Sequence, residues 1–269
     1  MRLSVPIPQE IIDSIINELH ANITALKACT LVSHSFHITS RKHIFSSIQL
    51  QKSSVLRKLL GILRSQPDIA FLVRKLSIAY EERAATTWFA EDKLLPPLLN
   101  MLHHLEILTL DFLHDAPSVA LSMELRLALI ERICAPDLTE LHIYGSARLP
   151  VSLIRHFTHL RQLCISFPDV DTEVDEQLPK SSFPIVLHLD TLHIPYLRPG
   201  LEPPSMRVFD FVTIATLKHL DIDLTTTQTL RVVQEVIRSS ATSIRSVHCH
   251  YLAYVRGSFF TISCCESLS

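Results

Sequence analysis

Residues 138–143 read LTELHI, an apolar-x-x-apolar-x-apolar pattern whose apolar positions are Leu138, Leu141 and Ile143. Its last residues alternate as a short strand does, so Leu141 and Ile143 are predicted to face a core while their neighbours face outward. Seven copies of this pattern begin 22 to 33 residues apart, a spacing typical of stacked strand-plus-helix repeats. The copies are VRKLSI from Val73, LEILTL from Leu105, LTELHI from Leu138, LRQLCI from Leu160, LDTLHI from Leu189, LKHLDI from Leu217 and IRSVHC from Ile244.

Amphipathic segments between the copies are predicted helices, so we expect an α/β fold in which parallel strands alternate with helices. The last residues, from Tyr251, show neither a further repeat nor a polar capping helix. We therefore expect an array that is incomplete or irregularly capped at this end. The predicted helices are Ser54–Ser65, Lys93–His103, Val119–Cys134, Pro150–Phe157 and Thr227–Ser239.

Composition excludes several classes of function. With 47% hydrophobic residues, 19% charged residues and a net charge of −2, the chain lacks the field that attracts nucleic acid or an anionic membrane. Its four glycines are scattered, which excludes a P-loop or a dinucleotide-binding GxGxxG loop, and no GxSxG elbow occurs. The six cysteines form no CxxC pair, and no signal peptide or membrane span is evident. We expect a reduced intracellular setting, cytoplasmic and/or nuclear.

Three apolar stripes precede the repeats. The first lies in the segment Ile7–His20, and the second in LKACTLVSHSF, Leu26–Phe36, where Leu26, Cys29, Leu31, Val32 and Phe36 are predicted to share one helical face. The third lies in Ser40–Leu50. Three helices this short cannot build much of a core alone, so we expect them to pack against a neighbour.

The order Ile-Pro-x-Glu-Ile-Ile, then Leu-x-x-Cys-x-Leu-Val-Ser-x-x-Phe, then Arg and Ile-Phe resembles the F-box of fungal F-box proteins over residues 5 to 50. The following copies resemble leucine-rich repeats, although no Asn follows each strand, so we expect an irregular solenoid. The resemblance implies a helical F-box-like module at 1–50 and a leucine-rich-repeat-like solenoid at 51–269. By the same resemblance, an adaptor-contacting surface comprises Ile7, Pro8, Ile11, Ile12, Ile15, Leu26, Leu31, Val32 and Phe36.

What the resemblance implies about function is a non-enzymatic substrate-recognition adaptor of a Skp-cullin-F-box ubiquitin ligase. The F-box would dock on a Skp-type adaptor and through it reach the cullin, while the repeats would hold a protein substrate. The alternative is a leucine-rich-repeat scaffold that binds protein without any ligase role, its first fifty residues serving only as a helical cap. In neither case do we expect nucleic acid or membrane as a partner.

The middle outward residue of each copy is predicted to align in one column on the concave face, because adjacent strands lie about 4.8 Å apart. His, Cys and Asp in this column are types of zinc ligand. Ligands on neighbouring flat strands rarely converge tetrahedrally, so we expect a polar recognition surface with no metal and no cofactor. A metal-dependent enzyme is the third hypothesis. The column is Ser77, Thr109, His142, Cys164, His193, Asp221 and His248, and the candidate substrate contacts are Glu140, His142, Tyr144, Cys164, His193, His219, Asp221, Asp223 and His248.

Overall fold

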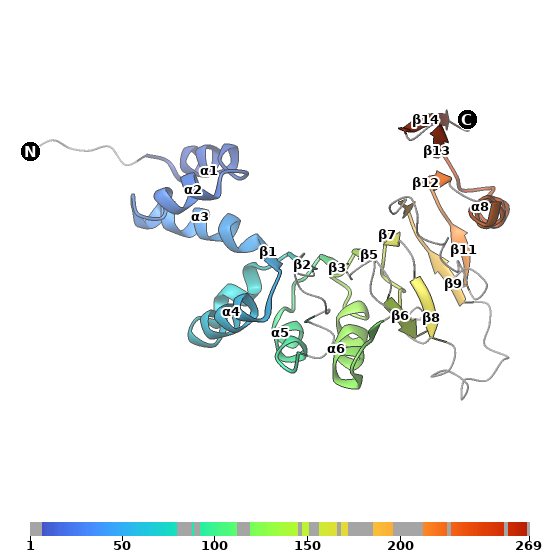
Figure 1. Ribbon diagram of the computed structural model, residues 1–269. Helices are drawn as coiled ribbons and strands as arrows, with labels where there is room; N and C mark the ends of the chain where they lie inside the picture. Colours follow the sequence, from blue (N-terminus) through green and yellow to red (C-terminus); the bar gives the residue numbers. More distant parts are fainter. Residues whose placement is uncertain are drawn as a thin grey trace, which may run out of the picture.

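A parallel β-sheet dominates the molecule (Figure 1). The computed structural model describes residues 7–79, 88, 92–111, 119–144, 147–150, 156–165, 168–171, 185–195, 212–224, 227–255 and 258–267. Within them the main sheet has nine strands, in the order β1-β2-β3-β5-β7-β10-β12-β13-β14, and all neighbours pair in parallel except β13 and β14. The strands are β1 Ser47–Leu50, β2 Lys75–Ala79, β3 Ile107–Asp111, β5 Glu140–Tyr144, β7 Gln162–Ile165, β10 Thr191–Ile194, β12 His219–Leu224, β13 Ser246–Val255 and β14 Ser258–Ser267. The predicted α/β class with parallel strands is confirmed.

Each copy of the repeat pattern gives one strand, and the strands pair in register. Leu141 lies between Leu108 of β3 and Leu163 of β7, so equivalent apolar residues stack across the sheet. The first apolar residue of every copy is buried as well, because the chain enters each strand from the core side. This stacking produces one continuous core that runs from Leu50 to Ile244.

Helices lie along one face of this sheet, and Figure 1 shows α4, α5 and α6 following one another on that side. Leu56, Leu98 and Leu129 are among their residues in the main core. The opposite face of the sheet, called the open face below, holds the outward side chains of the strands. The helices are α4 Ser53–Ser65, α5 Leu95–Met101, α6 Met123–Ile133 and α8 Thr227–Ser239, with a 3₁₀ helix η1 at Pro67–Leu72.

Four predicted helices are therefore present, with shorter bounds for two of them. Val119–Ala120, expected to begin a helix, forms the strand β4 instead, and Pro150 ends the strand β6. Residues 151–155 of the predicted helix Pro150–Phe157 lie outside the described residues. Two further small parallel sheets contain these and other short strands. Their members are β4 Val119–Ala120, β6 Ala147–Pro150 and β8 Pro168–Asp171 in one, and β9 Ile185–His188 and β11 Val212–Thr216 in the other.

Both ends of the main sheet differ from the sequence-based expectation. Ser47–Leu50, assigned above to a third helix, forms β1 and pairs with β2, because the alternating residues Ile48 and Leu50 face the main core. At the other end, the stretch from Tyr251 was expected to hold no repeat element. It contains the end of β13 and the strand β14, which folds back antiparallel on β13. The sheet thus begins before the predicted boundary at residue 51.

Three helices precede the sheet: α1 Gln9–Glu18, α2 Ile23–Cys29 and α3 His34–Ser46. The prediction that Leu26–Phe36 forms one helical face is wrong. The chain leaves the helix after Cys29 and restarts at His34, where Ser33 is extended and its hydroxyl accepts a hydrogen bond from the Phe36 amide at 3.4 Å. This N-cap starts a new helix. No helix of the described residues is long and apolar enough to cross a membrane.

Candidate functional site: an exposed apolar module and a polar strand face

Helices α1, α2 and α3, called the module below, have a small core of their own. Ile12, Ile16 and Leu26 are buried there, and Phe36 and Ile44 are half-buried against them. None of these residues belongs to the main core of the sheet. Ile12 and Leu26, expected to contact an adaptor, are therefore core residues of the module, and Phe36 contributes only its exposed part to any surface.

The remaining residues of the predicted adaptor surface are exposed. Ile11 and Ile15 are four residues apart, which places them on one side of α1, and Ile7 is exposed just before this helix. Pro8 is exposed at the N-cap of the same helix. Leu31 and Val32 occupy the turn between α2 and α3, where the Leu31 side chain is 87% exposed. We call this set the apolar docking face: Ile7, Pro8, Ile11, Ile15, Leu31 and Val32.

A polar contact fixes α1 on α3. The Thr39 hydroxyl donates a 2.7 Å hydrogen bond to Oδ1 of Asp13, and Gln9 donates a second at 2.8 Å. These two bonds hold the pKa of Asp13 below its usual value, the bond from Thr39 contributing most. The module is thereby held together by both an apolar core and a hydrogen-bonded pair of helices.

Helix α3 also joins the module to the sheet without a linker, because it runs directly into β1. Ile44 packs on the module core, whereas the next residue, Phe45, packs on the main core. The Arg74 amide donates to the Ser46 carbonyl at 2.9 Å, and Arg41 donates to Oε1 of Gln66 at 2.7 Å. Helix α3 thus holds the module at the β1 end of the sheet.

On the open face, the predicted column exists as expected. Cys164 pairs with His142 on one side and with His193 on the other, and Asp221 lies next to His193. His248 continues the column beyond Asp221. The register follows from the stacked leucines, since shifting any strand by one residue would turn its apolar side chains outward.

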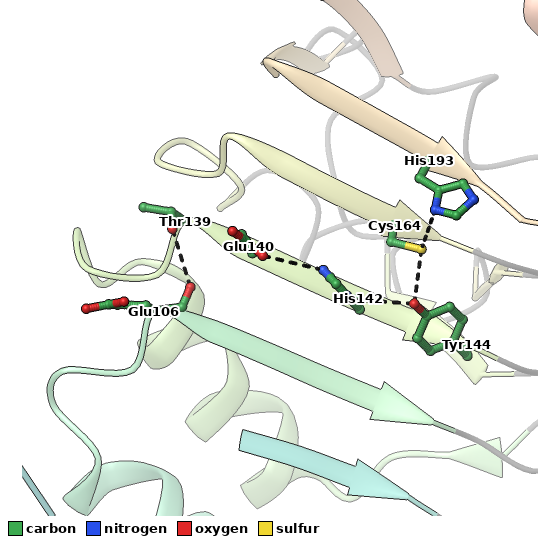
Figure 2. A network of polar contacts seen from close by, with 7 residues as sticks. All are labelled: Glu106, Thr139, Glu140, His142, Tyr144, Cys164 and His193. Carbon is green, nitrogen blue, oxygen red and sulfur yellow. Dashed lines mark hydrogen bonds and ion pairs between the residues drawn. The ribbon is translucent and has the colours of Figure 1, made fainter. Parts of the chain in front are cut away.

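Side chains of the column contact one another through Tyr144 (Figure 2). The Cys164 thiol donates to the Tyr144 hydroxyl at 3.3 Å, and this hydroxyl lies 3.5 Å from Nδ1 of His142. Nε2 of His142 lies 3.8 Å from a carboxylate oxygen of Glu140, and the Cys164 sulfur lies 3.7 Å from Nδ1 of His193. With its proton on Nε2, His142 accepts from Tyr144 and faces Glu140 with its N–H.

The network continues across β12. Asp221 lies between two imidazoles, with Oδ2 at 3.7 Å from His193 and Oδ1 at 3.2 Å from His250. His219 shares a 2.8 Å hydrogen bond with the Ser246 hydroxyl of the neighbouring strand. Asp223 pairs in register with His250. All nine candidate substrate contacts therefore lie on the open face of β5, β7, β10, β12 and β13.

Burial keeps the centre of this network uncharged. It is the largest cause of the lowered pKa of His142, which Glu140 opposes, and of the raised pKa of the Cys164 thiol. It also raises the pKa of Tyr144, with the Cys164 thiol adding to the shift. Thiol, imidazole and carboxylate thus stand in the order Cys164, His193, Asp221, as in nucleophilic sites. Here, however, the thiol is held protonated, which favours hydrogen bonding over nucleophilic attack.

This protonation predicts a reactivity difference between two cysteines. Cys164 is buried, whereas Cys134 is exposed. We expect iodoacetamide to alkylate Cys164 at least about tenfold more slowly than Cys134 in the folded protein at neutral pH, because alkylation needs an accessible thiolate. Mass spectrometry of the digested protein measures both rates. In denaturant the two rates should converge, and equally fast alkylation of both in the folded protein would contradict a buried, protonated Cys164.

One further feature, a row of charged residues that precedes the strands, does not follow from the predictions made for single positions. The second residue is charged in six of the seven repeat copies, and these residues form a charged rim, where Arg74 lies 3.3 Å from Glu106 and Lys218 lies 2.6 Å from Asp190. The contact with Lys218 holds the pKa of Asp190 low. Comparing this position across the seven copies, where opposite charges recur, would have predicted the rim.

Among the described residues, no group of three His, Cys, Asp or Glu side chains is arranged to hold a metal ion.

No protein-family model, curated protein or solved structure matches this chain. The fold and these surfaces define an α/β protein with a parallel sheet, one helical module that exposes apolar residues, and one polar strand face. What the chain does is inferred from these two surfaces.

Proposed function

We propose that the chain is a substrate-recognition adaptor of a Skp-cullin-F-box ubiquitin ligase. The module binds a Skp-type adaptor through the apolar docking face, and the open face of the sheet binds a protein target. The chain then acts by proximity, holding the target near a conjugating enzyme without changing any covalent bond itself.

The observation that carries this proposal is the combination of a separate module core with large exposed apolar residues around it. A helical cap would turn such residues toward the first repeat. Ile11, Leu31 and Val32 instead face solvent, while Phe45 and Ile48 meet the main core at this end. Exposed apolar side chains gathered on a small module are typical of a protein-binding surface. The resemblance of residues 5–50 to the F-box supplies the identity of the partner.

The open face supports the second half of the proposal. Its central groups, His142, Tyr144 and Cys164, are neutral hydrogen-bonding groups, while Glu140 and Asp221 add charge beside them. Such a surface, with an aromatic ring among fixed donors and acceptors, is suited to a folded or extended protein target. The stacked strands would give this surface a fixed shape against which the target could pack.

The docking face is tested by charge insertion. We expect Ile11→Asp/Val32→Asp to weaken binding to a purified Skp-type adaptor by about a hundredfold or more, because each change desolvates a carboxylate in an apolar interface. Titration calorimetry of the full chain against the adaptor measures the dissociation constant. Both positions are exposed, so the variant should keep the circular dichroism spectrum of the wild type.

A matched control carries the same two charges elsewhere. Ile62 of α4 and Met123 of α6 are also exposed apolar residues, but they lie outside the module. Ile62→Asp/Met123→Asp should bind the adaptor as the wild type does. Absence of binding by the unaltered chain, or an equal loss in this control, would overturn the proposed docking mode.

A further inference from the structure

A groove lies where the module meets the sheet, between α3 and η1. Its volume is about 330 Å³, and it is open on one side to solvent. This is near the lower end of the roughly 300–1,000 Å³ found for ligand pockets, so the groove is large enough for a few side chains but not for a domain. It is lined by His34, His37, Ile38, Arg41, Lys42, Asp68 and Leu72.

One face of α3 forms most of the wall, because His34, Ile38 and Arg41 recur at the spacing of successive helical turns. Arg41 is held in place rather than free. Its guanidinium donates to Gln66 Oε1 at 2.7 Å and lies 3.8 Å from Asp68 Oδ2. A fixed guanidinium loses little conformational freedom when a ligand arrives, which favours binding.

The groove has more positive than negative charge. Arg41 and Lys42 are cations at neutral pH, whereas Asp68 is the single acidic residue of the lining. The Asp68 side chain is 80% exposed, so water screens its attraction to Arg41 across the 3.8 Å contact. His34 and His37 add imidazole groups that can donate hydrogen bonds to an anion.

Apolar surface lies beside these cations. Ile38 is exposed on α3, Leu72 lines the opposite wall, and the neighbouring Phe71 is half-exposed. A ligand that used only charge would leave this surface in water. A purely apolar ligand would leave Arg41 with only the solvent-exposed Asp68, and Lys42 with only the carboxylate of Asp13, whose pKa it helps to lower. The lining therefore favours a ligand that combines both properties.

We propose that this groove binds an acidic peptide segment of a partner protein, with one apolar side chain of the segment seated against Ile38 and Leu72. Carboxylates on either side of that anchor pair with Arg41 and Lys42. None of the lining residues belongs to the apolar docking face or to the open face. The groove is thus a third interaction site, and it does not depend on the proposed ligase function.

The test uses the full chain and a short fluorescein-labelled peptide with a central leucine between glutamates. Fluorescence anisotropy should show saturable binding that weakens as salt is added. Lys42→Glu should weaken binding by about tenfold or more. The substitution removes the ammonium group that pairs with a peptide carboxylate and replaces it with a carboxylate that repels the peptide. Lys58→Glu, an exposed lysine of α4 outside the groove, changes net charge equally and should leave binding unchanged.

Two altered peptides separate specific binding from general attraction. Replacing the central leucine by glycine, or the glutamates by lysines, should abolish saturable binding. No saturable binding of the first peptide, equal effects of Lys42→Glu and Lys58→Glu, or full retention of binding by the glycine peptide would overturn the proposal. Adaptor binding by Lys42→Glu is measured in parallel, so that failure of the groove is distinguished from failure of the docking face.

Discussion

Leu141→Ala is expected to lower the free energy of unfolding by about 2–5 kcal/mol, since it removes a fully buried side chain and leaves a cavity. Leu141 lies in β5 near the middle of the main sheet, between Leu108 and Leu163. It is completely inaccessible to solvent, and its neighbours are fixed by register. Because strands on both sides hold the backbone, the site cannot collapse easily around the missing atoms. Denaturant unfolding followed by circular dichroism measures the change.

The adjacent residue provides the control. His142→Ala alters the same strand, but this side chain points to the open face, where it makes two long polar contacts and an edge-to-face contact with the Tyr144 ring. We expect its effect to stay within about 1 kcal/mol, as for other partly exposed polar pairs. Equal losses for Leu141→Ala and His142→Ala would mean that the alternation of buried and outward residues in β5 is wrong.

That alternation is also why the sequence predicts the sheet so well. In a copy such as LTELHI, Leu141 and Ile143 can both be buried only if the strand runs as observed, and His142 must then face outward. Seven successive copies impose the same condition, so the column containing His142, Cys164 and His193 follows from local pattern alone. No long-range information was needed to place these residues side by side.

The failures arise where one local pattern serves two structures. Ile48 and Leu50 continue the apolar set of the preceding helix, yet their spacing of two residues also fits a strand, and pairing with β2 decides between them. Leu31 and Val32 fit a helical stripe that includes Leu26, but the Ser33 cap restarts the helix after them. The spacing of apolar residues cannot reveal such competition, because the Ser33 cap is a hydrogen bond from a polar side chain and the pairing of β1 depends on the distant strand β2.

The polar network required structure for a different reason. The sequence predicts that Cys164 and His142 are neighbours, but not that Tyr144, two residues from His142, turns its hydroxyl between them. Nor does it predict that burial keeps the Cys164 thiol protonated, because burial depends on how closely several strands pack. Side-chain direction and desolvation belong to tertiary packing, and both decide whether this face suits recognition or chemistry.

The second large effect is expected in the module. Leu26→Asp should unfold α1, α2 and α3 while leaving the main sheet folded. Leu26 is fully buried in a core whose other buried members, within the part of the chain that the structure describes, are Ile12 and Ile16. An unpaired carboxylate there costs several kcal/mol, on the order of what so small a core can contribute. Hydrogen exchange followed by mass spectrometry should show loss of amide protection in residues 9–46 and unchanged protection in β3, β5 and β7.

Leu31→Asp is the matched control, because it adds the same carboxylate five residues away at a position that faces solvent. It should keep the protection of the module helices and still weaken adaptor binding, whereas Leu26→Asp loses both. The pair also distinguishes a docking module from a helical cap. A cap that the sheet needs would expose the main core when it unfolds, so Leu26→Asp would then deprotect β1 and β2 and lower the unfolding midpoint of the sheet. Separate cores predict that β2 and the following strands keep their protection and that the sheet keeps its unfolding midpoint. Any change is then limited to β1, next to Phe45 at the end of α3, and only binding through the module is lost.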